Sequence, residues 1–239
     1  MLAYRVIPAL LLRNGGLVKT LKFKDSKYVG DPINAIHIFN EKEVDELMVL
    51  DIMASKERLE PNYALIEQFA GECFMPLAYG GGVRTVEQAR RIFSLGVEKV
   101  CVQTAALENP RLISELAERF GSQSVMVSID IKKNWFGKPG LYAATQGKLH
   151  SASWQEMLRS LVAAGAGEVL LNAVDKDGTL SGPDLELIRE ASAAVEVPLV
   201  AVGGIACLAD IKAAVRAGAS AVAAGAFFVF HGPHRAVLI

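Results

Sequence analysis

The chain contains an internal repeat with a period of half its length. Segment 75–106 recurs as segment 197–228, a shift of 122 positions in a chain of 239 residues. Pro76 matches Pro198, and the pair Gly81-Gly82 matches Gly203-Gly204. A repeat on this scale indicates two copies of one structural unit. We therefore predict a single domain over residues 1–239, built from two halves at about 1–120 and 121–239.

Within each half, short apolar runs alternate with amphipathic helical stretches. A spacing of roughly 30 residues between such runs is typical of βα units that form a parallel sheet. The predicted strands are Arg5–Leu12, Glu46–Asp51, Pro76–Tyr79, Glu98–Val102, Val125–Ile131, Glu168–Ala173, Leu199–Val202 and Ala221–Ala224. The predicted helices are Pro61–Phe69, Thr85–Leu95, Pro110–Phe120, Ser153–Ala163, Pro183–Ser192 and Leu208–Ala217.

Eight βα units predict a closed (β/α)8 TIM barrel, a fold of about 250 residues. An open doubly wound sheet is the alternative, but it does not predict two equal halves. The eighth helix is the weakest element, because only His231–Ile239 remain after the last strand region and Gly232-Pro233 is its plausible start. Either this helix is short, at about two turns, or the chain stops early.

Composition excludes several classes of function. The hydrophobic content of 51% suits barrel strands that are buried on both faces. No apolar run is long enough to span a bilayer and the N-terminus does not resemble a signal peptide, so no membrane partner is expected. The cysteines show no CxxC pairing and disulfides are not expected, which points to a reducing cytoplasm. Three scattered cysteines and four histidines show no ligand spacing, so neither a metal nor another cofactor is predicted. A net charge of −1 gives no electrostatic footprint for nucleic acid.

Two glycine pairs predict anion sites at the carboxyl ends of the strands, where active sites of barrels lie. Glycines let backbone N–H groups and a helix N-terminus approach an anion closely. One pair alone is equally explained by packing, but two symmetric pairs favour a long substrate with a phosphate, or another anion, at each end. The predicted first cradle is Gly81, Gly82, Gln103 and Thr104; the second is Asp177, Gly178, Gly203, Gly204, Gly225 and Ala226. An ordinary Asp-Gly turn is the alternative for Asp177-Gly178.

Asp130 is the predicted catalytic acid or base. It ends the long apolar strand Val125–Ile131, where a carboxylate is costly unless it is used, although a structural cap is the alternative. Aligning Val125–Asp130 with Val6–Leu11, a shift of 119, places Leu11 at the equivalent position. A symmetric site with two facing carboxylates has therefore lost one of them.

Charged residues occupy two further places. The long loop Arg13–Gly30 is predicted to be a mobile flap, from which Lys19 could reach an anionic substrate. Four charged residues begin strands whose inward-facing series become apolar, so we expect them to meet at the barrel floor as a neutral charged ring. Ordinary surface charges at strand starts are the alternative. The charged ring consists of Arg5, Glu46, Lys99 and Glu168.

Six segments together resemble the cyclase subunit of imidazole glycerol phosphate synthase, from near Met1 to near Phe230. They are Met1–Arg5, Asp45–Leu47, Leu50–Ile52, Gly80–Gly82, Phe120–Gln123 and Asp175–Thr179. The resemblance implies a barrel of the ribulose-phosphate-binding type that holds a ribulosyl bisphosphate-type substrate between two phosphate sites. It also implies a heterodimer with a glutaminase docked on the floor. Ammonia from that partner passes through the core and adds to the substrate, and the product cyclises and splits.

The resemblance also implies roles for single residues. The charged ring matches the ammonia gate of the family, Lys19 matches its flap lysine, and Asp130 matches one of its two catalytic aspartates. This chain departs from the family pattern at three positions. Leu11 stands where the family has its other catalytic aspartate, Gln103 stands where it typically has asparagine, and Ala226 stands where a serine or threonine is expected. The ammonia route therefore looks intact, while the chemistry at the opposite end looks altered.

Three functions follow. The first is a lyase/cyclase subunit of a glutamine amidotransferase complex in histidine biosynthesis, which acts on a small phosphorylated substrate. The second is suggested by the departures, which resemble paralogues from surface-polysaccharide gene clusters: delivery of ammonia for amidination of an acetamido sugar. The third is a catalytically silent scaffold that activates the glutaminase.

Overall fold

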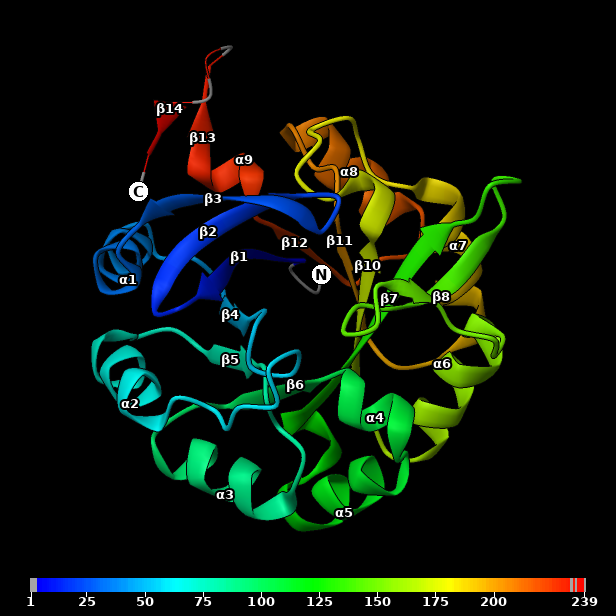
Figure 1. Ribbon diagram of the computed structural model, residues 1–239. Coiled ribbons are helices and arrows are strands. Elements are labelled where there is room, and N and C mark those ends of the chain that lie inside the picture. Colours follow the sequence, from blue (N-terminus) through cyan, green and yellow to red (C-terminus); the bar gives the residue numbers. More distant parts are fainter. Residues whose placement is uncertain (1–3, 233, 235, 239) are drawn as a thin grey trace.

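Among the residues that the structure describes, eight parallel strands close into a barrel (Figure 1). The structure is a computed structural model that describes residues 4–232, 234 and 236–238. The barrel strands are β1 (Arg5–Arg13), β4 (Leu47–Asp51), β5 (Leu77–Gly80), β6 (Lys99–Val102), β7 (Val125–Lys133), β10 (Glu168–Ala173), β11 (Leu199–Val202) and β12 (Ala221–Ala224). Each pairs with the next in chain order, and β12 pairs with β1 to close the circle. The predicted TIM barrel is confirmed.

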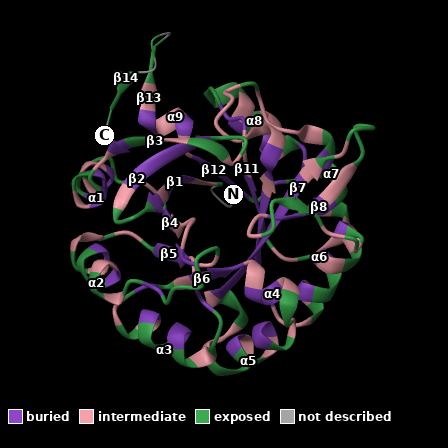
Figure 2. Cartoon of the chain, in the orientation of Figure 1, coloured by how far each residue is buried: buried purple, intermediate pink, exposed green. Residues whose placement is uncertain are grey.

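Helices form an outer ring and bury one face each against the strands (Figure 2). They are α1 (Pro32–Glu41), α2 (Tyr63–Glu72), α3 (Val86–Ser94), α4 (Thr104–Glu108), α5 (Arg111–Phe120), α6 (Trp154–Ala163), α7 (Leu185–Ala194), α8 (Leu208–Arg216) and α9 (Ala226–Val229), with 3-10 turns η1 (Ser122–Ser124) and η2 (Val174–Lys176). The six predicted helices correspond to α2, α3, α5, α6, α7 and α8. Helix α1 was not predicted; it begins at Pro32, and its N-cap Asp31 accepts a hydrogen bond from the backbone N–H of Asn34.

The internal repeat is visible in the structure. Shifted by 122 residues, β5 and α3 coincide with β11 and α8, and β6 coincides with β12. The backbone repeats as well: φ is +121° and +74° at Gly81 and Gly82, and +112° and +87° at Gly203 and Gly204. Only glycine adopts these angles readily. The two halves therefore present the same loop shape at two places around the barrel mouth.

The segment predicted as a mobile flap is an antiparallel extension of β1, and the prediction of a loop is wrong. Strands β2 (Gly16–Leu21) and β3 (Lys24–Gly30) pair with each other, and β2 pairs with the end of β1. The β1–β2 turn contains Asn14 and Gly15, both at positive φ. An Asn-Gly turn of this kind favours a tight hairpin. A second extension joins β7 to β8 (Pro139–Ala143) and β9 (Lys148–Leu149).

The predicted eighth helix does not form among the described residues. The short helix α9 is followed by an antiparallel pair, β13 (Phe230–His231) and β14 (Ala236–Val237). The predicted start includes Pro233, which lies outside the described residues. The backbone N–H of Leu238 donates to the carbonyl oxygen of Val229, so this segment folds back toward α9 as a hairpin.

The core has two parts. The larger fills the space between strands and helices, and the smaller lies inside the barrel. The inner cluster is Ile7, Ala9, Met48, Ala78, Cys101, Met126, Leu170, Val200, Ala221 and Ala223. Across the described residues, the structure contains no helix with the length and apolar character that crossing a membrane requires.

Candidate functional site

A cavity of about 350 Å³ opens at the carboxyl ends of the barrel strands. All the residues predicted for catalysis and for anion binding line it, and so does Leu11. They are Lys19, Gly81, Gly82, Gln103, Thr104, Asp130, Asp177, Gly178, Gly203, Gly204, Gly225 and Ala226. The barrel topology brings these residues together from β2, β7 and the loops that follow five other barrel strands.

Asp130 has a buried carboxyl group that accepts hydrogen bonds from two side chains. One oxygen accepts a hydrogen bond from Gln103 Nε2 at 2.5 Å, and the other accepts from Ser128 Oγ at 3.2 Å. Burial raises the pKa of Asp130 to about 7, although the hydrogen bonds from Ser128 and Gln103 oppose the rise. A carboxyl group with a pKa near neutrality is suited to give and to take a proton. This pKa agrees with an acid/base role, and Gln103 helps to orient the group.

The stability of the protein should depend on pH through Asp130. Because its pKa rises from 3.8 to about 7 on folding, its contribution to stability is fully present below pH 3.8 and is lost as pH rises through 7. Asp130→Asn removes this loss. Between pH 4 and pH 8 we expect the free energy of unfolding of the variant, relative to wild type, to grow by up to about 4 kcal/mol.

Urea unfolding at pH 4, 6 and 8 measures this difference. The matched control is Glu67→Gln, which neutralises an exposed carboxylate on α2. Its difference from wild type should stay nearly constant over the same range. An Asp130→Asn difference that does not change with pH would contradict the raised pKa.

Lys19 lies buried beside the second cradle rather than free on a flap. Its Nζ donates to the carbonyl oxygen of Ala9 at 2.7 Å, and burial lowers its pKa to about 8 against the opposing charge of Asp177. A Cβ atom on Gly225 would stand 2.0 Å from Lys19 Nζ. Glycine at 225 therefore makes room for the ammonium group, which gives the second cradle a positive charge.

Asp177 ties the β2–β3 hairpin to the barrel. Its carboxylate accepts from Thr20 Oγ1 at 2.7 Å and from the backbone N–H of Phe23 at 3.1 Å. Burial raises the pKa of Asp177 despite these hydrogen bonds and the charge of Lys19. Asp177 is therefore held by the hairpin as well as lying at the cavity wall.

Close backbone contacts fix both glycine pairs. A Cβ atom on Gly81 would stand 2.5 Å from the carbonyl oxygen of Asp51, and one on Gly204 would stand 2.2 Å from that of Gly182. The N–H of Gly82 donates to Ser55 Oγ at 3.2 Å, so Ser55 already occupies one donor of the first cradle. Larger side chains at these glycines would displace the loops that line the cavity.

Leu11 and Asp130 lie on opposite strands of the barrel. Strands β1 and β7 stand opposite each other in the eight-strand order, and they carry Leu11 and Asp130. Leu11 pairs in register with Leu50, which also lines the cavity. The wall that faces Asp130 therefore offers no group that can transfer a proton at this position.

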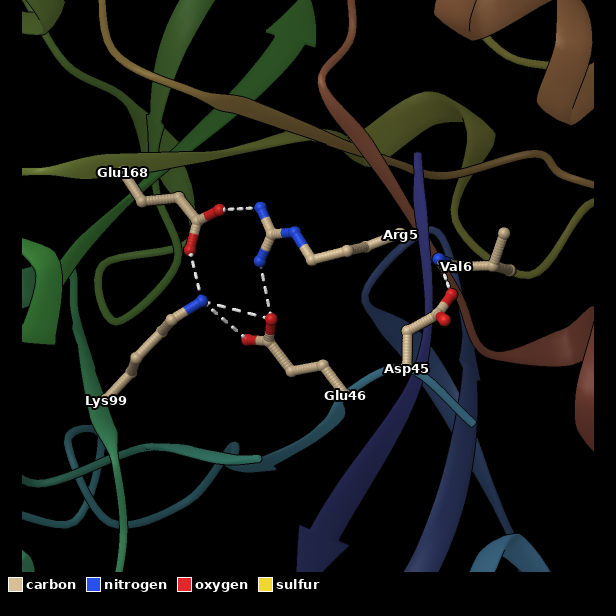
Figure 3. Close-up of polar contacts among 6 residues, drawn as sticks. All are labelled: Arg5, Val6, Asp45, Glu46, Lys99 and Glu168. Carbon is tan, nitrogen blue, oxygen red and sulfur yellow. Dashed lines mark hydrogen bonds and ion pairs between the residues drawn. The ribbon is translucent and has the colours of Figure 1, made fainter. Parts of the chain in front are cut away.

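At the opposite end of the barrel, four side chains form a closed ring of ion pairs (Figure 3). Arg5 contacts Glu46 at 2.5 Å and also contacts Glu168, while Lys99 Nζ lies 3.0 Å from Glu46 and 2.9 Å from Glu168. Glu46 and Glu168 are only 2% and 4% exposed. The geometry agrees with the predicted charged ring and disfavours ordinary surface charges.

The charges of the ring balance. Burial lowers the pKa of Arg5, but the hydrogen bonds and charges of Glu168 and Glu46 outweigh that effect, so its pKa is raised. Asp45, beside Glu46, accepts from the backbone N–H of Val6 at 2.9 Å and ties the start of β4 to β1 (Figure 3). Two buried carboxylates are tolerable here because each has two cationic partners.

Between the charged ring and the cavity lies the inner cluster of the barrel. Four of its members, Ala9, Met48, Cys101 and Leu170, also form part of the cavity wall. Cys101 is buried, and burial raises the pKa of its thiol, so it stays protonated. The interior between the two ends is therefore neutral and mostly apolar.

Three polar residues of the site were missed by sequence reasoning. Ser128 binds Asp130, Thr20 binds Asp177, and Asn172 lines the cavity beside Asp130, its partner in the register of β10 and β7. The Oδ1 atom of Asn172 is buried without a hydrogen-bond partner among the described residues. Ser128 stands in Ser128-Ile129-Asp130, two positions from Asp130 and thus on the same face of the strand, which was the one available signal.

Comparisons with known proteins show the family of this chain. Residues 5–233 match the model of the family described as histidine biosynthesis protein. A Pseudomonas aeruginosa protein provisionally named imidazole glycerol phosphate synthase subunit hisF2 is 54% identical over 100% of this chain and 96% of its own length. A Vibrio vulnificus protein provisionally named subunit hisF3 is 52% identical, over 100% of this chain and 93% of its own. Imidazole glycerol phosphate synthase subunit HisF of Thermobifida fusca is 40% identical, over 96% of this chain and 91% of its own.

Proposed function

Because this chain belongs to the histidine biosynthesis protein family, we propose that it is the cyclase-type subunit of an imidazole glycerol phosphate synthase. In this role it is a lyase/cyclase that uses ammonia to convert a ribulosyl bisphosphate-type substrate. The observation that carries the proposal is the position of Asp130. This buried carboxyl group, with a pKa of about 7, lines a cavity between two symmetric glycine cradles.

A glutaminase partner supplies the ammonia. We place its docking surface on the floor around the charged ring, because that end lies opposite the substrate cavity. Neutral ammonia would pass the charged ring and then the inner cluster, whose apolar side chains neither bind nor protonate it strongly. The two subunits would form a heterodimer with one continuous path between two active sites.

In the cavity, each residue has a distinct role. The two cradles hold the two phosphate groups, and Lys19 adds a positive charge at the second. Asp130 transfers protons as ammonia adds and water leaves, and again as the ring closes and the product splits. Gln103 and Ser128 hold its carboxyl group in position through their hydrogen bonds.

One observation favours a second function. Leu11 faces Asp130 across the cavity, and loss of one acid/base partner typically removes a factor of about 10² to 10⁴ in rate. The chain would then deliver ammonia to a separate enzyme that amidinates an acetamido sugar in surface-polysaccharide biosynthesis. Two relatives bear the numbered names hisF2 and hisF3, and such numbering supports the view that this chain is a paralogue.

A silent scaffold that only activates the glutaminase is the third candidate. It predicts faster glutamine hydrolysis on mixing with the glutaminase and no anion binding in the cavity. The cyclase and delivery functions both require an open path for ammonia, which the scaffold does not. Measuring ammonia released at the cavity end, rather than glutamate alone, separates the scaffold from the other two.

We expect two phosphate ions to bind, one in each cradle. Backbone N–H groups and the positive ends of helix dipoles converge there. Gly204→Ala and Gly82→Ala place a Cβ atom where φ is positive and within 2.2 Å and 2.9 Å of a carbonyl oxygen, so each should disrupt one cradle. Crystals soaked in phosphate should show two sites in wild type and one in each variant.

Far-ultraviolet circular dichroism checks that both variants keep the fold. Gly137→Ala is the control, because Gly137 also has positive φ but lies in an open turn away from the cavity. It should retain both ions. Two empty cradles in the wild-type crystal would remove the case for a bisphosphate substrate.

A further inference from the structure

The hairpin β7–β8 carries two adjacent aromatic side chains at its tip. Trp135 is 96% exposed and Phe136 is 85% exposed. The hairpin extends outward beyond the ring of helices, and its tip is exposed (Figures 1 and 2). Neither residue lines the cavity. Two neighbouring aromatic side chains in water are unfavourable unless a partner covers them.

Hydrogen bonds within the turn hold the tip in shape. Asn134 donates its backbone N–H to the carbonyl oxygen of Lys138 at 2.9 Å. Its side-chain Oδ1 accepts from the backbone N–H groups of Phe136 at 2.9 Å and of Lys138 at 3.0 Å. Gly137 supplies the positive φ of +75° that closes the turn. The aromatic pair is therefore presented by a defined turn.

The hairpin segment itself is rich in lysine, while Asp175 and Asp184 from outside it bind Lys133 at its base. Segment 131–150 contains four lysines and no aspartate or glutamate. Lys133 pairs with Asp184 at 2.8 Å, and Lys132 lies 4.8 Å from the ring centre of Tyr142. Lys138 and Lys148 are exposed and form no ion pair with any described residue. Lys138, two residues after Phe136, is thus free to meet an external anion beside the aromatic pair, whereas Lys148 pairs in register with Ala143 at the other end of β8.

We propose that this tip binds the surface of a lipid bilayer that carries anionic headgroups. Trp and Phe each bury about 150–250 Å², so two of them cover far less than the roughly 800 Å² per partner of a stable protein interface. A convex tip needs no complementary pocket when it inserts into the interface between headgroups and acyl chains. Trp is favoured in that layer, and lysines are attracted to anionic lipids.

The contact orients the molecule. Strand β8 runs from the tip to Tyr142 and Ala143, and Tyr142 lines the cavity. Because the hairpin continues β7 at its carboxyl end, attachment through the tip involves the mouth side of the barrel and not the floor with the charged ring. The floor stays free for a glutaminase. The inference goes beyond the proposed function and holds for any chemistry in the cavity.

Sedimentation with vesicles tests the proposal. The full-length protein is mixed with vesicles of phosphatidylcholine alone or of phosphatidylcholine with about 30% phosphatidylglycerol, and bound protein is measured against lipid concentration. We expect binding to the anionic vesicles that weakens as salt rises. Trp135→Ala/Phe136→Ala should weaken the apparent affinity at least tenfold, and Lys138→Glu at the tip should also weaken it.

Two further variants sharpen the result. Phe74→Ala removes an 86% exposed aromatic residue just before β5, far from the hairpin in the chain, and should bind like wild type. In Trp154→Phe, which lacks the buried tryptophan, the remaining emission comes from Trp135 and should shift to shorter wavelength on anionic vesicles.

Three outcomes would overturn the proposal. One is no binding to anionic vesicles, and another is equal binding by wild type and the Trp135→Ala/Phe136→Ala variant. The third is a change in the oligomeric state of that variant without any vesicle binding by wild type, which would assign the tip to a protein contact. None of these outcomes bears on ammonia use or phosphate binding, so the proposed function is tested separately.

Discussion

Leu11→Asp is expected to raise ammonia-dependent cyclase activity by about 10² to 10⁴-fold, the range that one general acid or base typically contributes. Leu11 lies on β1, directly across the barrel from the strand that carries Asp130, and it lines the same cavity. In the proposed cyclase reaction, addition of ammonia, loss of water, ring closure and cleavage would require proton transfers on both sides of the substrate. Of these two opposed positions, wild type has a carboxyl group only at Asp130, so its own activity should be low.

The measurement is product formation from the histidine-pathway substrate with an ammonium salt, which makes the glutaminase unnecessary. Leu11→Asn is the matched control, because it has nearly the shape of the aspartate variant and cannot take a proton. It should stay at the wild-type rate. A gain with Leu11→Asp alone would show that the remaining site is complete and dormant.

Two results would change the conclusion. Wild-type turnover at an ordinary enzymatic rate, of order 1 s⁻¹ or faster, would remove the case for the polysaccharide function, and another group would have to supply the missing proton. A folded Leu11→Asp variant without any gain would show that the site lacks more than one carboxylate. Gln103 and Ala226 would then be the next residues to exchange, because both depart from the family pattern at the cradles.

The barrel was predictable because its determinants are repeated and periodic. Strand β11 and helix α8 lie 122 residues after β5 and α3, which is the shift of the sequence repeat. Predicting the first βα unit therefore also predicts the second. Helix α1 was missed although Asp31-Pro32 is a good helix start, because the preceding segment was interpreted as one long flap. The pair β13–β14 has two residues per strand, which is too short for any periodic pattern.

The cavity was predictable for a related reason. In a barrel, every loop that follows a strand opens on the same face, so residues far apart in the sequence can be assigned to one site. The contacts around Asp130 were not predictable in this way. Asn172 and Ser128 matter because of the register of β10 with β7 and the direction of single side chains. Such details depend on packing between strands, which no local pattern encodes.

Lys99→Met is expected to lower the free energy of unfolding by about 3–5 kcal/mol, the usual cost of removing one member of a buried ion pair. Lys99 contacts both Glu46 and Glu168, which are only 2% and 4% exposed. Without it, two buried carboxylates share Arg5 alone. The protein should still fold, because typical domains have 5–15 kcal/mol to lose.

The same variant should uncouple the two reactions if the charged ring controls entry of ammonia. In the complex with its glutaminase, glutamine hydrolysis should continue while the ammonia used per glutamine falls. Free ammonium should restore product formation, because it enters from the cavity side. The charge-balanced variant Lys99→Met/Glu168→Gln leaves Arg5 paired with Glu46, so it should recover most of the lost stability and remain uncoupled.

If Lys99→Met loses stability but still uses ammonia with wild-type efficiency, the ring is a structural element of the floor and not a gate. If neither variant loses stability, the ion pairs do not carry the energetic weight that their burial implies.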